Sequence, residues 1–329
     1  WVTVGDTKYP SKLEYILDNR IYKEESITNV NVKPGLAAEV FEPEPLTEFD
    51  PLAYDAKGAD EGIMHTQFFH RWDATFIPWG EPTDNGAIDM GNFDLTQFHI
   101  GPQYVGENVK IIGRPDNRLW ALAIKTAEGV VMVDAPLNQD WTRSLLNAAK
   151  TAFSGEEIVG VISTQARHDH FGGIREAAYE AEKVYIADAP ESVDFLKRVL
   201  NSEHTIHPDN LAKNPKNVEI ETVSNVTYLD NGAVEIHRLS PDGDALVVYI
   251  PEHKVIYQTN QLWNGTFMYI WDGNGPNGYT PETIDKLSKN AKELLNYIEA
   301  NNLDVEKIIG SHGGLGPISD LVRVANKEF

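Results

Sequence analysis

The chain has 329 residues, of which 41% are apolar, enough to bury one large core or two smaller ones. Fifty acidic residues against 28 basic ones give a formal net charge of −22, which repels nucleic acid and anionic membrane surfaces. The absence of cysteine excludes disulfides, thiolate metal ligands and a cysteine nucleophile. Any metal must therefore be bound by histidine or carboxylate side chains, and a small molecule is the expected partner.

Two features bear on where the protein resides. No apolar run approaches the ~20 residues that a helix needs to span a bilayer, so we expect no membrane-embedded segment. The sequence begins at Trp1 rather than at Met, and it is acidic and free of cysteine. Together these features slightly favour an exported protein, periplasmic or secreted, over a cytoplasmic one.

Residues 1–106 differ in composition and periodicity from the rest of the chain. They contain a Pro/acid stretch at 42–45 and turn signals at 78–82, and they show little long periodicity. We predict an irregular N-terminal extension that packs on the main domain and covers apolar surface there. The aromatic-rich segment 68–72 is a second possibility, as a lid or as the contact of a homodimer.

Regular patterns begin near residue 107. Short apolar runs bounded by turn residues predict strands, and apolar residues at helical spacing predict helices. In chain order the expected elements are strands at 109–112, 119–124 and 130–133, a helix over 138–153, a strand at 158–163, a helix over 174–181, a strand at 184–186 and a helix over 191–200.

The second half of the chain repeats the order of strands followed by helices. Its expected elements are strands at 220–229, 234–239, 246–250 and 255–257, a helix over 281–301, a strand at 305–309 and a helix over 318–326. Two such runs predict two sheets packed face to face with helices outside. The fold class expected for residues 107–329 is therefore α/β, a four-layer αββα sandwich.

Polar side chains crowd at the carboxyl end of the strand expected at 158–163. Gln165, Arg167, Asp169 and His170 lie within six residues of one another and precede the pair of glycines at 172–173. Open α/β sheets place their sites at the carboxyl ends of strands. A polar loop that caps the next helix would explain the glycines and Asp169, but it would not explain so many adjacent polar groups. We therefore predict a functional site here.

The segment 164–173 resembles the metallo-β-lactamase-fold signature Thr-His-x-His-x-Asp-His-x-Gly-Gly, with Asp169 and His170 in register. The similarity continues along residues 107–329. The segment 129–136 resembles the family's early strand, which ends in an Asp, here Asp134. The Gly-Ser-His-Gly-Gly run that contains His312 is similar to the family's final His-Gly motif. The resemblance implies the αββα sandwich and descent from hydrolases.

The resemblance also implies a set of metal ligands. In such proteins three histidines bind a first zinc ion, while an Asp, the adjacent His and the last His bind a second, and another Asp bridges the two. Here Gln165, Arg167 and Ser240 fall at the positions of the three histidines, and Asn260 falls at the bridging Asp. Because an arginine cannot give up its proton to bind a metal, these residues argue against a two-zinc centre.

Two states of the site remain open. Asp169, His170 and His312 persist, and two histidines with one carboxylate can hold a single Zn, Fe or Mn ion with positions left open. Alternatively no metal binds, and Arg167 supplies the positive charge by pairing with Asp169 or with a carboxylate, sulfate or phosphate of a ligand. The histidines then serve as acid–base groups. His168, between these residues, is expected to face solvent or to lie behind the ligands.

Two functions are compatible with these residues. One is an enzyme with hydrolase-like or lyase-like chemistry on a small anionic or ester-like substrate. The other is a non-catalytic ligand-binding or regulatory protein that keeps the fold and the cleft. The candidate catalytic residues are Asp169, His170, His312 and Arg167. The candidate substrate-binding residues are Gln165, Arg167, Ser240, Asn260 and Trp263, the last of which begins an aromatic-rich stretch that could instead pack in the core.

Overall fold

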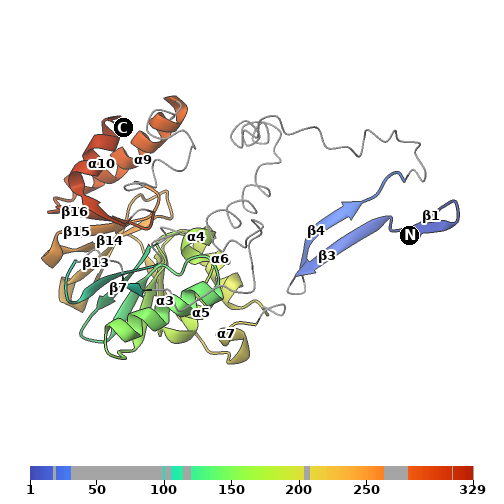
Figure 1. Ribbon diagram of the computed structural model, residues 1–329, viewed down its shortest axis with the longest axis horizontal. Coiled ribbons are helices and arrows are strands. Elements are labelled where there is room, and N and C mark those ends of the chain that lie inside the picture. The colour runs from blue at the N-terminus through green and yellow to red at the C-terminus, as the bar shows by residue number, and fades with distance from the viewer. Residues whose placement is uncertain are drawn as a thin grey trace, which may run out of the picture. The chain divides into compact units, whose positions relative to one another are not determined.

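The computed structural model describes residues 1–17, 20–30, 99–100, 105–113, 120–203, 208–262, 281–312 and 314–328. The chain divides into two compact units (Figure 1). The first comprises residues 1–66 and 202–208, and the second comprises residues 67–201 and 209–329. The expected boundary between residues 106 and 107 and the dimer contact stay predictions, since the segments 42–45 and 68–72 lie outside the described residues.

The described part of the first unit contains two antiparallel hairpins. They pair β1 (Val2–Val4) with β2 (Thr7–Tyr9), and β3 (Lys12–Leu17) with β4 (Arg20–Ser26). On the second hairpin the Lys12 ammonium lies 2.7 Å from a carboxylate oxygen of Glu14 in the same strand and 2.7 Å from one of Glu24 in the partner strand. Such cross-strand pairs stabilise a two-stranded sheet, and the sequence analysis did not predict these strands.

The first sheet of the second unit has seven strands in the order β11-β10-β9-β8-β7-β6-β5. The strands are β5 (His99–Ile100), β6 (Val109–Gly113), β7 (Trp120–Lys125), β8 (Val130–Val133), β9 (Ile158–Ile162), β10 (Lys183–Ala187) and β11 (Glu219–Val223). Strands β5 to β8 pair antiparallel, whereas β8 to β11 pair parallel. The residues that follow β8 and β9 therefore emerge side by side.

The second sheet has six strands in chain order. They are β12 (Val226–Leu229), β13 (Val234–Arg238), β14 (Leu246–Ile250), β15 (Val255–Gln258), β16 (Lys307–Gly310) and β17 (Gly314–Pro317). All neighbours pair antiparallel except β15 and β16, which are parallel. The chain that leaves β15 therefore lies beside the chain that leaves β16.

The helices described are α3 (Gln139–Ala152), α4 (His168–Phe171), α5 (Ile174–Glu180), α6 (Pro190–Leu200), α7 (Asn210–Lys213), α9 (Pro281–Ala300) and α10 (Ile318–Ala325). Helix α3 begins after Asn138, whose side-chain oxygen accepts hydrogen bonds from the main-chain N–H groups of Asp140 and Trp141. Among the described residues, no helix has the length and apolarity that would let it cross a membrane. Export of the protein stays a prediction.

Three apolar layers separate the sheets and helices. Along β7, Ala123 faces the layer beneath α3 and α5, whereas Leu122 faces the layer between the two sheets. This alternation is what a strand buried on both faces requires. A third layer, with Leu294 and Leu321, lies between the second sheet and the helices α9 and α10. Figure 1 shows these helix pairs on opposite sides of the two sheets, so the expected αββα sandwich is confirmed.

One strand predicted from the sequence is divided in the structure. The single strand expected at 220–229 is two strands in different sheets, β11 and β12, separated at Ser224 and Asn225. The hydroxyl of Ser224 donates to Asp188 across 2.6 Å, which marks where the chain leaves the first sheet. Apolar residues recur on both sides of Ser224 and Asn225, so the segment was interpreted as one strand although these two polar residues interrupt the alternation. The short strand β17 and the one-turn helix α4 were also not predicted.

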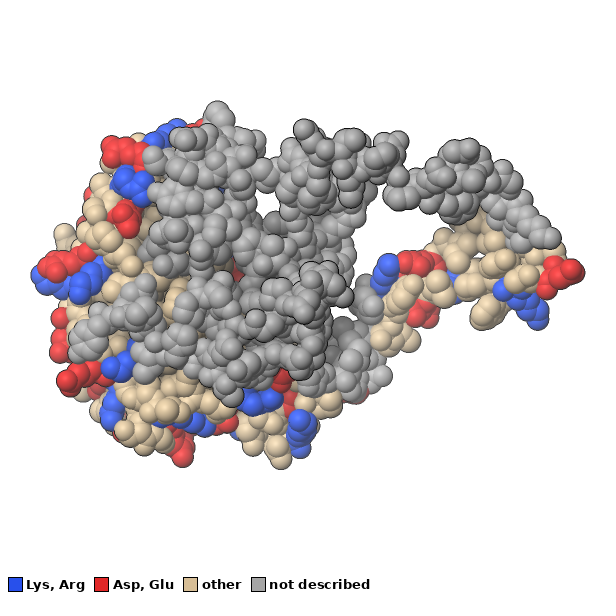
Figure 2. Space-filling model, viewed as in Figure 1, with Lys and Arg blue, Asp and Glu red and all other residues tan. Residues whose placement is uncertain are grey.

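On the face shown in Figure 2, acidic and basic side chains of the described residues are interspersed and do not gather into one patch. Some charged residues form ion pairs between segments distant in the sequence, such as Lys150 with Glu180 at 2.7 Å and Lys125 with Glu156 at 2.6 Å. These pairs are partly exposed, so each contributes little to stability.

Candidate functional site

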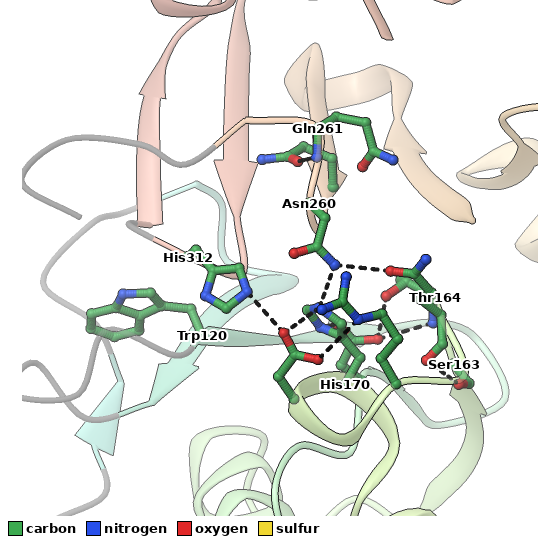
Figure 3. Close-up of polar contacts among 12 residues, drawn as sticks. Trp120, Ser163, Thr164, His170, Asn260, Gln261 and His312 are labelled. Atoms are coloured by element: carbon green, nitrogen blue, oxygen red, sulfur yellow. Dashed lines mark hydrogen bonds and ion pairs between the residues drawn. The ribbon is translucent and has the colours of Figure 1, made fainter. Parts of the chain in front are cut away.

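The polar residues singled out in the sequence come together where strands of both sheets end (Figure 3). Asp134 follows β8, Thr164 follows β9, and helix α4 begins four residues later. From the second sheet, Asn260 follows β15 and His312 follows β16. Because each pair of strands is parallel, the four segments converge at one edge of the sandwich.

Asp134 lies behind this site and accepts several hydrogen bonds. It is 3% exposed, and its backbone is left-handed, with φ 69°. One carboxylate oxygen accepts from the main-chain N–H and the hydroxyl of Thr164, at 3.0 and 2.6 Å. The other lies 3.1 Å from Nδ1 of His170 and 2.9 Å from the hydroxyl of Tyr257. With Nδ1 held by a carboxylate, Nε2 of His170 is the ring nitrogen turned to the site.

Asp169, His170 and His312 form a group of three buried ligand atoms that lie within 4.8 Å of one another. One carboxylate oxygen of Asp169 is 3.2 Å from Nε2 of His312 and 3.3 Å from Nε2 of His170. The two imidazole rings meet edge to face, with centroids 5.5 Å apart. Two imidazole nitrogens and one carboxylate oxygen converging on one point suit a single divalent ion.

The charges of this group are strongly coupled. Burial opposes the charged forms, but the carboxylates of Asp169 and Asp134 raise the pKa of His170 to about 10. Burial likewise opposes ionisation of Asp169, yet the charge of His170 and the hydrogen bonds from both histidines hold the pKa of that carboxyl well below its usual range. Burial lowers the pKa of His312, against the effect of its hydrogen bond to Asp169. A positive charge on His170 is therefore stabilised by the carboxylates of Asp169 and Asp134, as the charge of a bound cation would be.

The side-chain amides of Gln165 and Asn260 form a hydrogen-bonded chain beside His170. The Asn260 amide nitrogen donates to the Gln165 side-chain oxygen at 2.9 Å and lies 3.1 Å from Nε2 of His170. The Gln165 amide nitrogen donates to Asp244 at 3.1 Å, and the hydroxyl of Ser192 donates to the same carboxylate at 3.4 Å. Amides bonded to each other in this way do not fit a second metal ion.

Arg167 and Ser240 lie at the margin of the site. The Arg167 side chain is 56% exposed, and its Nε lies 3.9 Å from the other oxygen of Asp169. Ser240 accepts a hydrogen bond from the N–H of Gly243 through its main-chain oxygen, in the turn that carries Asp244. Trp263, also a candidate, lies outside the described residues.

The sequence analysis missed three residues that surround the site. Asp244 stands four residues after Ser240, and nothing in its spacing distinguished it from a surface acid in a turn. Tyr257 lies in a buried strand, where an aromatic residue usually fills space. Gln258 follows it, fully buried, and its carboxamide bonds the main chain at Gln261 and Leu262. A polar residue in an otherwise apolar strand was the available signal for Gln258.

No protein-family model and no curated protein matches the chain. Among solved structures it is similar to the DIM-1 metallo-beta-lactamase, with 19% identity and a TM-score of 0.47, over 70% of this chain and 97% of that one. A metallo-beta-lactamase from Hirschia baltica matches with 21% identity and a TM-score of 0.45, over 70% and 98%. One from Pontibacter korlensis matches with 16% identity and a TM-score of 0.47, over 70% and 99%.

The sheet topology and the three apolar layers carry the structural conclusion. This chain has a metallo-β-lactamase-like fold. Within this metallo-β-lactamase-like fold, Asp169, His170 and His312 form a candidate metal group, whereas Gln165, Arg167 and Asn260 do not supply a second.

Proposed function

We propose that the protein is an enzyme of hydrolase descent that binds one divalent metal ion through Asp169, His170 and His312 and acts on a small anionic or ester-like substrate. The observation that carries this proposal is the buried group of three ligand atoms within 4.8 Å of one another. Zn, Fe and Mn are the ions that such nitrogen and oxygen ligands suit. A single ion, unlike a pair, is compatible with the amides at Gln165 and Asn260.

Each residue of the site has a role in this proposal. When bound, a divalent ion polarises a substrate oxygen and lowers the pKa of bound water. Asp134 orients His170 through Nδ1, so that Nε2 faces the ion. Arg167, exposed at the margin, binds a carboxylate or phosphate of the substrate through two parallel hydrogen bonds. The substrate is thereby held beside the ion by its own negative charge.

Metal analysis of protein purified without chelator tests the proposal. We expect one equivalent of Zn, Fe or Mn in the wild type and its loss in His312→Ala, with near-UV circular dichroism to verify that the variant is folded. His168→Ala is the matched control, because His168 lies in the same short helix as Asp169 but outside the ligand group. Two equivalents, none, or one that persists without His312 would overturn the single-ion proposal.

A second function, ligand binding without catalysis, is favoured by one observation. The Asn260 amide nitrogen lies 3.1 Å from Nε2 of His170, so it covers the nitrogen that a metal needs. In this case metal-free protein binds inorganic phosphate or acetate, and Arg167→Ala abolishes the binding. Calorimetric titration of phosphate into wild-type protein with and without Co²⁺ separates the two functions: the affinity stays the same in a metal-independent binding protein, whereas it rises with the ion in the enzyme.

A further inference from the structure

A continuous chain of hydrogen bonds runs from Asp244 into the site. The Asp244 carboxylate accepts from the amide nitrogen of Gln165 at 3.1 Å, and the Gln165 oxygen accepts from the amide nitrogen of Asn260 at 2.9 Å. The same nitrogen of Asn260 lies 3.1 Å from Nε2 of His170 (Figure 3). Asp244 itself touches neither His170 nor Asp169 by any contact described, so it acts on the site only through the two amides.

The Asp244 carboxylate fixes which group donates in each of these hydrogen bonds. An ionised carboxylate only accepts hydrogen bonds, so Gln165 must turn its NH₂ group toward Asp244. Its oxygen then faces Asn260 and requires a donor, which turns the Asn260 NH₂ group toward Gln165. The same NH₂ group is thereby turned toward Nε2 of His170, 3.1 Å away, which accepts its second N–H when the imidazole is neutral. An amide alone can present either its oxygen or its nitrogen. Here the Asp244 carboxylate, which is linked to Asn260 through Gln165, decides which group Asn260 presents.

Main-chain hydrogen bonds on both sides of the turn hold Asp244 beside Gln165. The main-chain N–H of Leu246, at the start of β14, donates to the oxygen of Thr164 at 2.8 Å, next to Gln165 in the chain. The N–H of Leu239 donates to the oxygen of Ala245 at 3.0 Å and closes the turn. The hydroxyl of Ser192 holds the second carboxylate oxygen from helix α6. Two main-chain hydrogen bonds and the Ser192 hydroxyl thus position the Asp244 carboxylate.

We propose that Asp244 is a positioning residue which, through Gln165, makes Asn260 present an N–H donor to the site, and that this donor selects substrates by an acceptor oxygen. The part that concerns substrates rests on the proposed function. An ion held by Asp169, His170 and His312 would take the lone pair of His170 Nε2, and the N–H of Asn260 would then need another acceptor. A carbonyl, carboxylate or phosphoryl oxygen satisfies it, and a donor such as an ammonium group is rejected.

The positioning role is tested on metal-free protein by NMR of the side-chain NH₂ groups, whose Gln165 and Asn260 signals are assigned by their loss in Gln165→Glu and Asn260→Asp. In Asp244→Asn the side chain at position 244 can donate as well as accept, so the orientations of the Gln165 and Asn260 amides are no longer fixed. We expect both NH₂ signals to shift in this variant. Asp242→Asn, in the same turn and exposed, is the control that leaves both unchanged. An Asn260 signal unmoved in Asp244→Asn overturns the positioning role.

The substrate part is tested with inorganic phosphate on protein loaded with Co²⁺, whose visible absorption reports changes in its ligands. Phosphate affinity should fall about tenfold in Asp244→Asn, the effect of one misdirected hydrogen bond to a charged group, and should be unchanged in Asp242→Asn. If the signals of Asn260 shift but phosphate affinity does not fall, the selection of acceptor oxygens is wrong. If the wild type takes up no Co²⁺, the proposed function fails, and the NMR result alone still decides the role of Asp244.

Discussion

The Oδ2 atom of Asp134 lies 3.1 Å from Nδ1 of His170, on the side of the imidazole ring that faces away from the site. The contact joins the end of β8 to helix α4, so the orientation of the histidine is set by the first sheet. The hydroxyl of Tyr257 reaches the same carboxylate oxygen from the second sheet. The candidate metal group therefore depends on a residue that is not one of its ligands.

Asp134→Asn should weaken this group without disturbing the backbone. Asparagine tolerates the left-handed conformation at position 134, so the substitution chiefly removes a charged acceptor. We expect the free energy of unfolding in urea to fall by about 1.5–3 kcal/mol. Metal affinity should fall roughly 10–100-fold, the usual effect of losing a carboxylate behind a ligating histidine. Asp230→Asn, at a partly exposed position that is also left-handed, is the control. An unchanged metal affinity would contradict this role.

The sequence was sufficient to predict the sandwich because both of its signals are local. Apolar runs in β7, β8 and β14 are typical of strands buried on two faces, and the glycines after His170 mark the turn into α5. The motif also predicted which of its residues converge, since parallel strands end at one edge. What spacing could not show is the partner of each polar group.

Gln165 illustrates the limit. Its position in the motif indicated a lost metal ligand, but its hydrogen bonds go to Asp244 and Asn260, residues 79 and 95 positions further along the chain. Such contacts depend on how the two sheets are packed, and no local pattern encodes them. The break between β11 and β12 was missed for a related reason, because apolar residues recur on both sides of it and no local pattern shows that the two segments join different sheets.

Gln258 should stabilise the loop that carries Asn260. Its side-chain oxygen accepts from the N–H groups of Gln261 and Leu262, and its nitrogen donates to the oxygen of Leu262 at 2.6 Å. Gln258→Met keeps the length of the side chain but removes these bonds. Each buried group left unpaired costs about 1–3 kcal/mol, so the loop should open more readily. Hydrogen exchange of the amides at 261 and 262 should quicken while that of β16 does not, and equal protection in both proteins would refute this.

Arg167 should oppose metal binding and favour anion binding. Its guanidinium lies 3.9 Å from Asp169, and a positive charge there repels a cation bound to the same carboxylate. Because the side chain is more than half exposed, solvent screens the effect, and Arg167→Gln should raise Co²⁺ affinity by less than about tenfold. Acetate affinity should fall in the same variant. Arg198→Gln, exposed on helix α6, is the control for net charge. A decrease in Co²⁺ affinity in Arg167→Gln would contradict the repulsion.

His237, which is not part of the candidate metal group, should make the protein less stable in mild acid. It is 3% exposed between β13 and α9, and its ring nitrogens bond Glu235 at 2.8 Å and the hydroxyl of Tyr297 at 3.2 Å. Burial lowers the pKa of His237, although Glu235 opposes the shift. The unfolded chain, whose histidine titrates near 6.5, therefore binds more protons than the folded one just below that pH.

This difference in bound protons determines how His237 changes the free energy of unfolding with pH. The stability contributed by neutral His237 is present above about pH 6.5, and it is lost as the pH falls from there toward the lower pKa of the folded state. The contribution of His237 to the free energy of unfolding in urea should therefore drop between about pH 7.5 and about pH 5.5, against the opposite contribution of His170, whose pKa is raised. In His237→Phe, which cannot titrate, this drop should shrink even if the variant is less stable at both values, because its hydrogen bonds to Glu235 and Tyr297 are lost. His253→Phe, outside the core, serves as the control and should keep the wild-type drop. A drop in His237→Phe equal to that of the wild type would show that another group is responsible.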